Sequence, residues 1–127
     1  TKEGALRLRV ADTTDPGALL AIQRQINPDR ALFIVATKSG GTVETLSGFK
    51  FFYNWITDQP GGGDAGQHFI AITDPGSSLV DLAGKYSFRH VFLNDPNIGG
   101  RYSALSYFGL VPAMLLGISA SEHLNRA

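Results

Sequence analysis

The chain has 127 residues, of which 43% are hydrophobic and 17% charged, so it can bury a core and differs in composition from a disordered segment. Eleven basic residues balance eleven acidic ones, and a formal net charge of zero argues against a nucleic-acid surface. The lack of cysteine excludes disulfides and thiolate metal sites. We therefore expect one globular domain, residues 1–127, that binds no metal.

Two stretches bear on where the protein acts. Residues 1–9 have no apolar core of the signal-peptide type. The longest apolar stretch, residues 108–118, is too short to span a bilayer and contains Pro112, so we interpret it as a buried helix. The sequence thus predicts a cytoplasmic protein that does not bind a membrane.

The first third of the chain predicts a strand, a helix and a second strand. Residues 6–10 alternate apolar and basic side chains, which is typical of a strand with one exposed face. Asp15 and Pro16 form a typical helix start, and this helix ends before Pro28. Residues 31–36 are almost all apolar, which indicates a strand covered on both faces.

The rest of the chain alternates helices with strands. After an amphipathic helix, the glycines of residues 61–66 predict a flexible surface loop. Strands at 68–73 and 89–93 flank a short helix that ends at Gly84, and a last helix begins near Tyr102. Such alternation predicts a parallel sheet in an α/β fold, which binds ligands at the carboxyl ends of its strands.

The strongest chemical signal is a turn rich in glycine and hydroxyl groups between an apolar strand and a helix. Free N–H groups at a helix N-terminus attract anions. The spacing differs from that of a nucleotide P-loop, so we predict a phosphomonoester ligand. The alternative is an ordinary strand-to-helix turn with Thr42 as the helix N-cap and Glu44 or Thr45 completing the cap, and it is compatible with anion binding. The turn consists of Thr37, Lys38, Ser39, Gly40, Gly41 and Thr42, and Thr45 adds a further hydroxyl.

A second loop, residues 94–101, follows the last predicted strand and carries Gly100 and Arg101. A lone arginine after two glycines is usually a surface residue. Here it begins an apolar helix, where a guanidinium can stabilise negative charge on a substrate oxygen, as in enolate-forming chemistry. Because both loops follow strand ends, we expect them to face one ligand. The three histidines have no metal-like spacing.

Two segments together resemble the glucose-6-phosphate isomerase family of sugar-isomerase (SIS) domains. Residues 37–45 are similar to the pattern S-K-[ST]-x-x-T-x-E-T, and residues 99–103 are similar to the more particular Gly-Gly-Arg-Tyr-Ser motif. The likeness extends over residues 6–118, and parts of it look most like variants fused behind a transaldolase. It implies a three-layer α/β/α, flavodoxin-like parallel sheet.

The resemblance also implies roles for the site residues. Arg101, beside Gly100, would stabilise the cis-enediolate formed as a proton moves between C1 and C2, without metal or organic cofactor. The sugar phosphate would be bound by the hydroxyls of Thr37, Ser39 and Thr42 and by the amides of Lys38, Gly40 and Gly41.

The sequence departs from the family pattern at larger features. The family's opening strand with its G-x-G-G-S loop is absent, and so are its later glutamate base, histidine and lysine. General base catalysis needs a positioned carboxylate, so we expect a partial SIS domain that is inactive alone and that acts with a second copy or the remainder of a parent enzyme. The alternatives are a non-catalytic phosphosugar-sensing module of a regulator, which the first motif fits equally well, and a purely structural domain.

Overall fold

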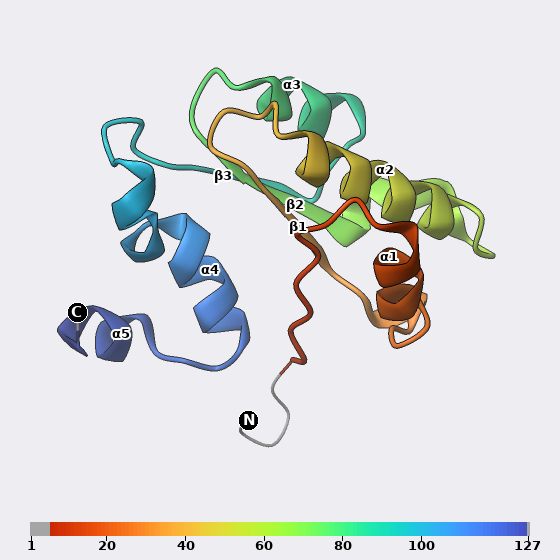
Figure 1. Ribbon diagram of the computed structural model, residues 1–127, viewed down its shortest axis with the longest axis horizontal. Helices are drawn as coiled ribbons and strands as arrows, with labels where there is room; N and C mark the ends of the chain where they lie inside the picture. Colours follow the sequence, from red (N-terminus) through yellow and green to blue (C-terminus); the bar gives the residue numbers. More distant parts are fainter. Residues whose placement is uncertain (1–5, 127) are drawn as a thin grey trace.

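The computed structural model describes residues 6–126 of the chain (Figure 1). In this part, three parallel strands form one sheet in the order β1-β2-β3: β1 (Phe33–Ala36), β2 (Phe69–Thr73) and β3 (His90–Leu93). The α-helices of the same part are α1 (Pro16–Gln23), α2 (Val43–Thr57), α3 (Ser78–Lys85), α4 (Tyr107–Leu115) and α5 (Ala120–Arg126). Short 3-10 helices are η1 (Pro28–Arg30), η2 (Gly62–His68) and η3 (Gly100–Leu105).

The sheet lies between two layers of helices, which confirms the predicted three-layer α/β/α fold (Figure 1). Successive side chains of a strand point to opposite faces. Accordingly, Phe69 and Ala71 of β2 pack in the core that includes residues of α1, α2 and α3, whereas Ile70 and Ile72 pack in the core that includes Val111 of α4. The continuous apolar runs of the sequence follow from this burial on both faces.

The two cores differ in size and composition. The α1–α3 side is rich in aromatic rings. Phe69 is fully buried, and its ring stacks on that of Phe33 with 4.8 Å between the ring centroids and forms a T-shaped pair with that of Phe49 at a centroid distance of 5.4 Å. Among the described residues, the core on the α4 side contains three buried ones, Ile70, Ile72 and Val111. Most of the apolar burial that holds the sheet in place therefore lies on the α1–α3 side.

The structure confirms several elements that the local sequence predicted. Asp15 caps α1, and its carboxylate accepts a hydrogen bond from the amide of Ala18 at 2.9 Å, with Pro16 as the first helical residue. The register of the sheet pairs Val35 with Ala71, and Ala71 with Val91. Strands β1, β2 and β3, their parallel pairing, and helices α2 and α3 between them are as expected.

The predicted strand at residues 6–10 is wrong. These residues are exposed and have no regular secondary structure, and β2 is the only partner of β1 within residues 6–126. Alternation of apolar and basic side chains predicts a strand only if a neighbouring strand can take up its backbone hydrogen bonds. The outer edge of β1 carries no such partner in the described part of the chain.

Two glycine predictions are also wrong. Residues 61–66 do not form a flexible loop, because η2 begins at Gly62 and buries Gly66, where an ideal Cβ would lie 1.9 Å from the carbonyl oxygen of Tyr86. Gly84 does not end α3, which continues to Lys85; the chain instead reverses through Ser87, with φ of 54°. Close packing, rather than flexibility, explains the glycine at position 66.

The C-terminal region differs from expectation as well. The last apolar helix, α4, begins at Tyr107 rather than near Tyr102, because η3 precedes it and Ser106 caps α4. The interpretation of residues 108–118 as a buried helix is wrong, since α4 buries only Val111 and leaves Met114 58% exposed. Among the helices of residues 6–126, none is both long and apolar enough to cross a membrane.

Candidate functional site

The predicted phosphate-binding turn, residues 37–42, follows the carboxyl end of β1 and leads into α2. Thr37 is 6% exposed, and its amide donates to the carbonyl oxygen of Ile72 at 3.1 Å, so the start of the turn is attached to the sheet. Gly40 has φ of +80°, and an ideal Cβ on it would lie 2.6 Å from the amide nitrogen of Leu79. Only glycine fits this position without strain, so packing fixes the shape of the turn.

The N-terminus of α2 has no side-chain cap from any residue that the structure describes. Thr42 occupies the N-cap position, but its hydroxyl lies 2.8 Å from that of Thr37 and makes no capping hydrogen bond. The amides of the first helical turn, at Val43, Glu44 and Thr45, have no acceptor within the helix. The predicted cap through Thr42 with Glu44 or Thr45 is therefore wrong in its side-chain detail, and these amides stay available to an anion.

The hydroxyl groups of the turn are only partly engaged. The pair formed by Thr37 and Thr42 uses one of its two O–H hydrogens, so the other can donate to a ligand. The amide of Gly41 donates to the hydroxyl of Ser39 at 3.4 Å, a long hydrogen bond that an anion can replace. Ser39, Gly41 and Thr42 are exposed.

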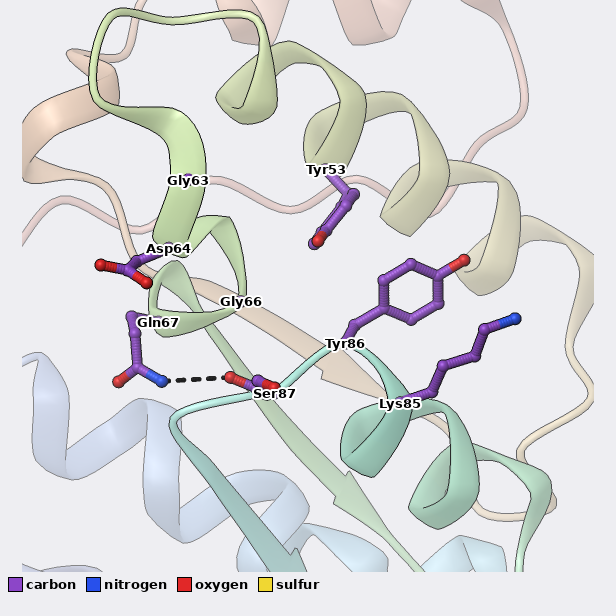
Figure 2. Close-up of a pocket in the computed structure, with 8 residues that line it drawn as sticks. All are labelled: Tyr53, Gly63, Asp64, Gly66, Gln67, Lys85, Tyr86 and Ser87. Atoms are coloured by element: carbon purple, nitrogen blue, oxygen red, sulfur yellow. Dashed lines mark hydrogen bonds between the residues drawn. The ribbon is translucent and has the colours of Figure 1, made fainter.

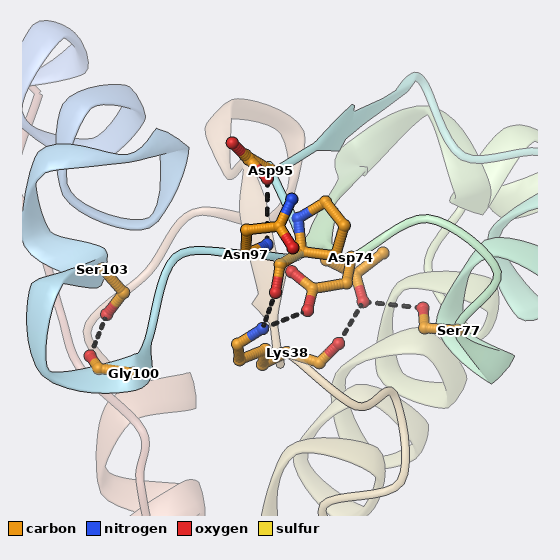
Figure 3. A network of polar contacts seen from close by, with 9 residues as sticks. Lys38, Asp74, Ser77, Asp95, Asn97, Gly100 and Ser103 are labelled. Atoms are coloured by element: carbon orange, nitrogen blue, oxygen red, sulfur yellow. Dashed lines mark hydrogen bonds and ion pairs between the residues drawn. The ribbon is translucent and has the colours of Figure 1, made fainter.

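The side chain of Lys38 is not a free cation. Its ammonium group forms an ion pair with Asp74, which follows β2, and donates to the carbonyl oxygen of Pro96 at 3.3 Å (Figure 3). The backbone of Lys38 is bonded to the same region, because the amide of Asp74 and the hydroxyl of Thr73 both donate to the carbonyl oxygen of Lys38 at 3.3 Å. No sequence signal indicated this ion pair, because an Asp-Pro pair after a strand also suits an ordinary turn.

The second predicted segment, around Gly100 and Arg101, is held mainly by local hydrogen bonds. The carboxamide oxygen of Asn94, a residue 5% exposed, accepts from the amide of Tyr107 at 3.0 Å and so fixes the start of α4 to the end of β3. The hydroxyl of Ser103 donates to the carbonyl oxygen of Gly100 at 2.7 Å (Figure 3). The Arg101 side chain is exposed and makes no hydrogen bond or ion pair within residues 6–126.

Both segments lie at the carboxyl ends of the strands, as expected. The contact between Lys38 and Pro96 brings the predicted phosphate-binding turn to the loop that precedes Gly100. Arg101 itself does not touch the turn through any polar contact in the described part of the chain. A ligand with a phosphate at one end and a reacting carbonyl at the other would have to bridge the two segments.

A separate cavity of about 180 Å³ lies at the opposite ends of the strands (Figure 2). Tyr53, Tyr86 and Lys85 line it together with residues of η2, and Gln67 donates to the carbonyl oxygen of Ser87 beside it at 3.1 Å. Because η2 precedes β2 and Ser87 precedes β3, this cavity is at the amino edge of the sheet and outside the predicted site.

The histidines and acidic residues form no metal centre in the part of the chain that the structure describes. The ring of His68 lies with Nδ1 3.0 Å from the carbonyl oxygen of Ala31, which is a structural contact between the segments that precede β1 and β2.

The fold and this site define a three-layer α/β domain in which a strand-to-helix turn at the carboxyl edge of the sheet has no side-chain cap among the described residues. The chain belongs to the phosphoglucose isomerase family, whose sequence profile matches residues 1–126. It is 36% identical over 125 residues to the glucose-6-phosphate isomerase of Carboxydothermus hydrogenoformans, covering 98% of this chain and 26% of that protein. It is 31% identical over 115 residues to a glucose-6-phosphate isomerase of Thermus thermophilus, covering 91% and 28%.

Solved structures agree with this assignment. The crystal structure of hypothetical protein TT0462 from Thermus thermophilus superimposes with a TM-score of 0.84 at 31% identity, over 93% of this chain and 28% of that one. A glucose-6-phosphate isomerase from Chlamydia trachomatis gives 0.73 at 31% identity, over 82% and 19%. The resemblance and the fold class are thereby confirmed, and the chain spans about a quarter of the length of the curated relatives it matches.

Proposed function

We propose that this chain is the phosphosugar-binding part of a glucose-6-phosphate isomerase, which interconverts glucose 6-phosphate and fructose 6-phosphate. The observation that carries the proposal is the uncapped N-terminus of α2 beside the hydroxyls of Thr37 and Thr42, at the carboxyl edge of the sheet. Membership of the phosphoglucose isomerase family supports the choice of substrate.

In this proposal the phosphate is held mainly by neutral donors. The positive charge of Lys38 is already paired with Asp74, so the turn attracts a dianion through the helix N-terminus and oriented N–H and O–H groups. The tight packing of Gly40 against α3 keeps these donors in position before the ligand arrives, which lowers the entropy lost on binding. The phosphate ligands proposed are the hydroxyls of Thr37, Ser39 and Thr42 and the amides of Lys38, Gly40, Gly41 and the first turn of α2.

Arg101 is the proposed catalytic group of the chain. A base removes the proton from the carbon next to the carbonyl group, and negative charge develops on the carbonyl oxygen as the cis-enediolate forms. A guanidinium at that oxygen stabilises this charge more than the neutral substrate, which lowers the barrier. Arg101 is exposed and makes no polar contact within the described residues, so it is free to meet a substrate, with Gly100 beside it.

The base, the histidine and the lysine of the reaction belong, in this proposal, to the remainder of a parent enzyme or to another subunit. Glu44 is not offered as the base, because it lies in the first turn of α2 and its place matches the helix start of the family motif. The reaction moves a proton and leaves the oxidation state of the sugar unchanged, so it needs no redox cofactor. This chain alone is expected to bind the sugar phosphate and to leave it unreacted.

An assay of the full-length protein tests the proposal. We expect the full-length protein to interconvert the two hexose phosphates. We expect this chain alone to bind fructose 6-phosphate without converting it. Binding by both without turnover in either would favour the phosphosugar-sensing module. A full-length protein that neither binds nor converts sugar phosphates would leave only a structural role.

A further inference from the structure

We propose that the side chain of Lys38 is a positioning residue for the loop that carries Arg101, rather than a ligand of the phosphate. Its backbone amide remains among the proposed phosphate ligands. The catalytic consequence rests on the proposed function, whereas the effect on the loop does not.

Three residues that lie far apart in the sequence meet at the carboxyl edge of the sheet. Lys38 follows β1, Asp74 follows β2 and Pro96 follows β3, so each belongs to a different loop. The ammonium group of Lys38 contacts the carboxylate of Asp74 and donates to the carbonyl oxygen of Pro96 at 3.3 Å (Figure 3). One side chain therefore connects all three strand ends.

The largely buried carboxylate of Asp74 holds the ammonium group of Lys38 beside it. The Asp74 side chain is only 16% exposed, and its second oxygen, Oδ1, is buried without a hydrogen-bond partner among the described residues. A carboxylate in such surroundings depends on its cation, because breaking the pair leaves a poorly solvated charge. A phosphate that drew Lys38 away would have to bear this cost and the repulsion of the carboxylate that it exposed.

The loop that receives Lys38 has few other anchors. Asp95 and Asn97 form a local turn on either side of Pro96, in which the amide of Asn97 donates to the Asp95 carboxylate at 2.9 Å. Among the described residues, the bond from Lys38 to Pro96 is the only hydrogen bond between the phosphate-binding turn and residues 94–101. Loss of this bond is therefore expected to change where Arg101 lies, while the turn keeps its own packing.

Four variants of the full-length protein test the assignment: Lys38→Met, Asp74→Asn, the double variant, and Lys50→Met as a matched control on the exposed face of α2. The measurements are kcat with fructose 6-phosphate, the inhibition constant of inorganic phosphate, and hydrogen exchange of the amides of residues 97–101. The double variant removes the buried charge together with its partner, so it separates the loss of the connection from the cost of an unpaired carboxylate.

We expect Lys38→Met and Asp74→Asn each to lower kcat by about 10- to 100-fold, as a misplaced catalytic group does. The inhibition constant of phosphate should change by less than about threefold, since both variants keep all the proposed phosphate ligands. Both variants should speed exchange in residues 97–101, and the double variant should lower kcat no further than the worse single variant. Lys50→Met should behave like the wild type.

Two results would overturn the assignment. If Lys38→Met weakens the binding of phosphate by more than about tenfold and Asp74→Asn strengthens it, the Lys38 side chain is a phosphate ligand and Asp74 competes with phosphate for it. If exchange in residues 97–101 is the same in every variant, the side chain does not hold the loop. A wild-type protein that neither turns over fructose 6-phosphate nor binds phosphate would refute the proposed function instead, and the exchange measurement would still decide whether Lys38 holds the loop.

Discussion

The two segments of the candidate site are held in place by different means. The predicted phosphate-binding turn is fixed by packing, because Thr37 is buried and Gly40 lies against the backbone of α3. The segment that carries Arg101 is fixed by a few hydrogen bonds, of Asn94 to Tyr107 and of Lys38 to Pro96, and the arginine is exposed. We infer that the turn keeps its shape without a ligand. The position of Arg101, by contrast, depends on hydrogen bonds that other residues of its loop make.

The largest effect should come from Arg101. In the full-length protein, Arg101→Ala is expected to lower kcat by about 10²- to 10³-fold, the usual loss when a donor to a developing oxyanion is removed. Inhibition by inorganic phosphate should be unchanged, because the phosphate turn is intact. Arg89→Ala, on an exposed arginine at the other edge of the sheet, is the control. Unchanged turnover in Arg101→Ala would remove the arginine from the mechanism.

A substitution in the turn should act on stability. Gly40→Ala introduces a Cβ beside the backbone of Leu79 at a positive φ, so we expect the free energy of unfolding to fall by about 2–4 kcal/mol. Gly41→Ala is the matched control, because an ideal Cβ on Gly41 meets no atom within 4 Å; its change should stay within about 0.5 kcal/mol. Urea denaturation measures both. Equal losses in the two variants would mean that packing does not fix the turn.

A smaller loss is expected at the end of β3. Asn94→Ala removes the acceptor of the Tyr107 amide, which should cost about 1–2 kcal/mol and loosen the start of α4. Asn97→Ala alters an exposed residue whose backbone amide, rather than its side chain, makes the local bond, and serves for comparison. Thermal unfolding with hydrogen exchange of residues 105–110 reports the difference, and identical exchange in both variants would contradict the anchoring role of Asn94.

The smallest effect should follow from the loss of one hydroxyl. Thr42→Val keeps the shape of the side chain but removes a donor to the phosphate, and should weaken fructose 6-phosphate binding by about five- to tenfold. Thr57→Val removes a hydroxyl that bonds to the carbonyl oxygen of Tyr53 at the far end of α2, and should leave binding unchanged. Titration calorimetry compares the two, and a Thr42→Val variant that binds like the wild type would place the phosphate elsewhere.

Much of the fold could be predicted because its signals are local. Buried runs predicted β1 and β2, and helical spacing predicted α2, since both periodicities reflect burial within one element. The errors arose where the outcome depends on distant parts of the chain. Residues 6–10 have a strand-like pattern but no neighbour to pair with in the described part of the chain, and Gly66 lies under the backbone of Tyr86 rather than in an open loop.

The candidate site divides in the same way. Its turn is contiguous, so the order of Thr37, Gly40 and Thr42 was enough to locate it. The partners of Lys38, by contrast, are Asp74 and Pro96, 36 and 58 residues away along the chain, and only the parallel pairing of the strands brings them together. The roles given to the site residues, and the fusion to a transaldolase, stay predictions.

A crystal structure of the protein with fructose 6-phosphate bound would show directly whether the turn at the start of α2 holds the phosphate. We expect the phosphate oxygens to accept hydrogen bonds from the first-turn amides of α2 and from the hydroxyls of Thr37 and Thr42, with Lys38 still on Asp74. A phosphate bound away from the α2 N-terminus, with these donors left to solvent, would contradict the proposal.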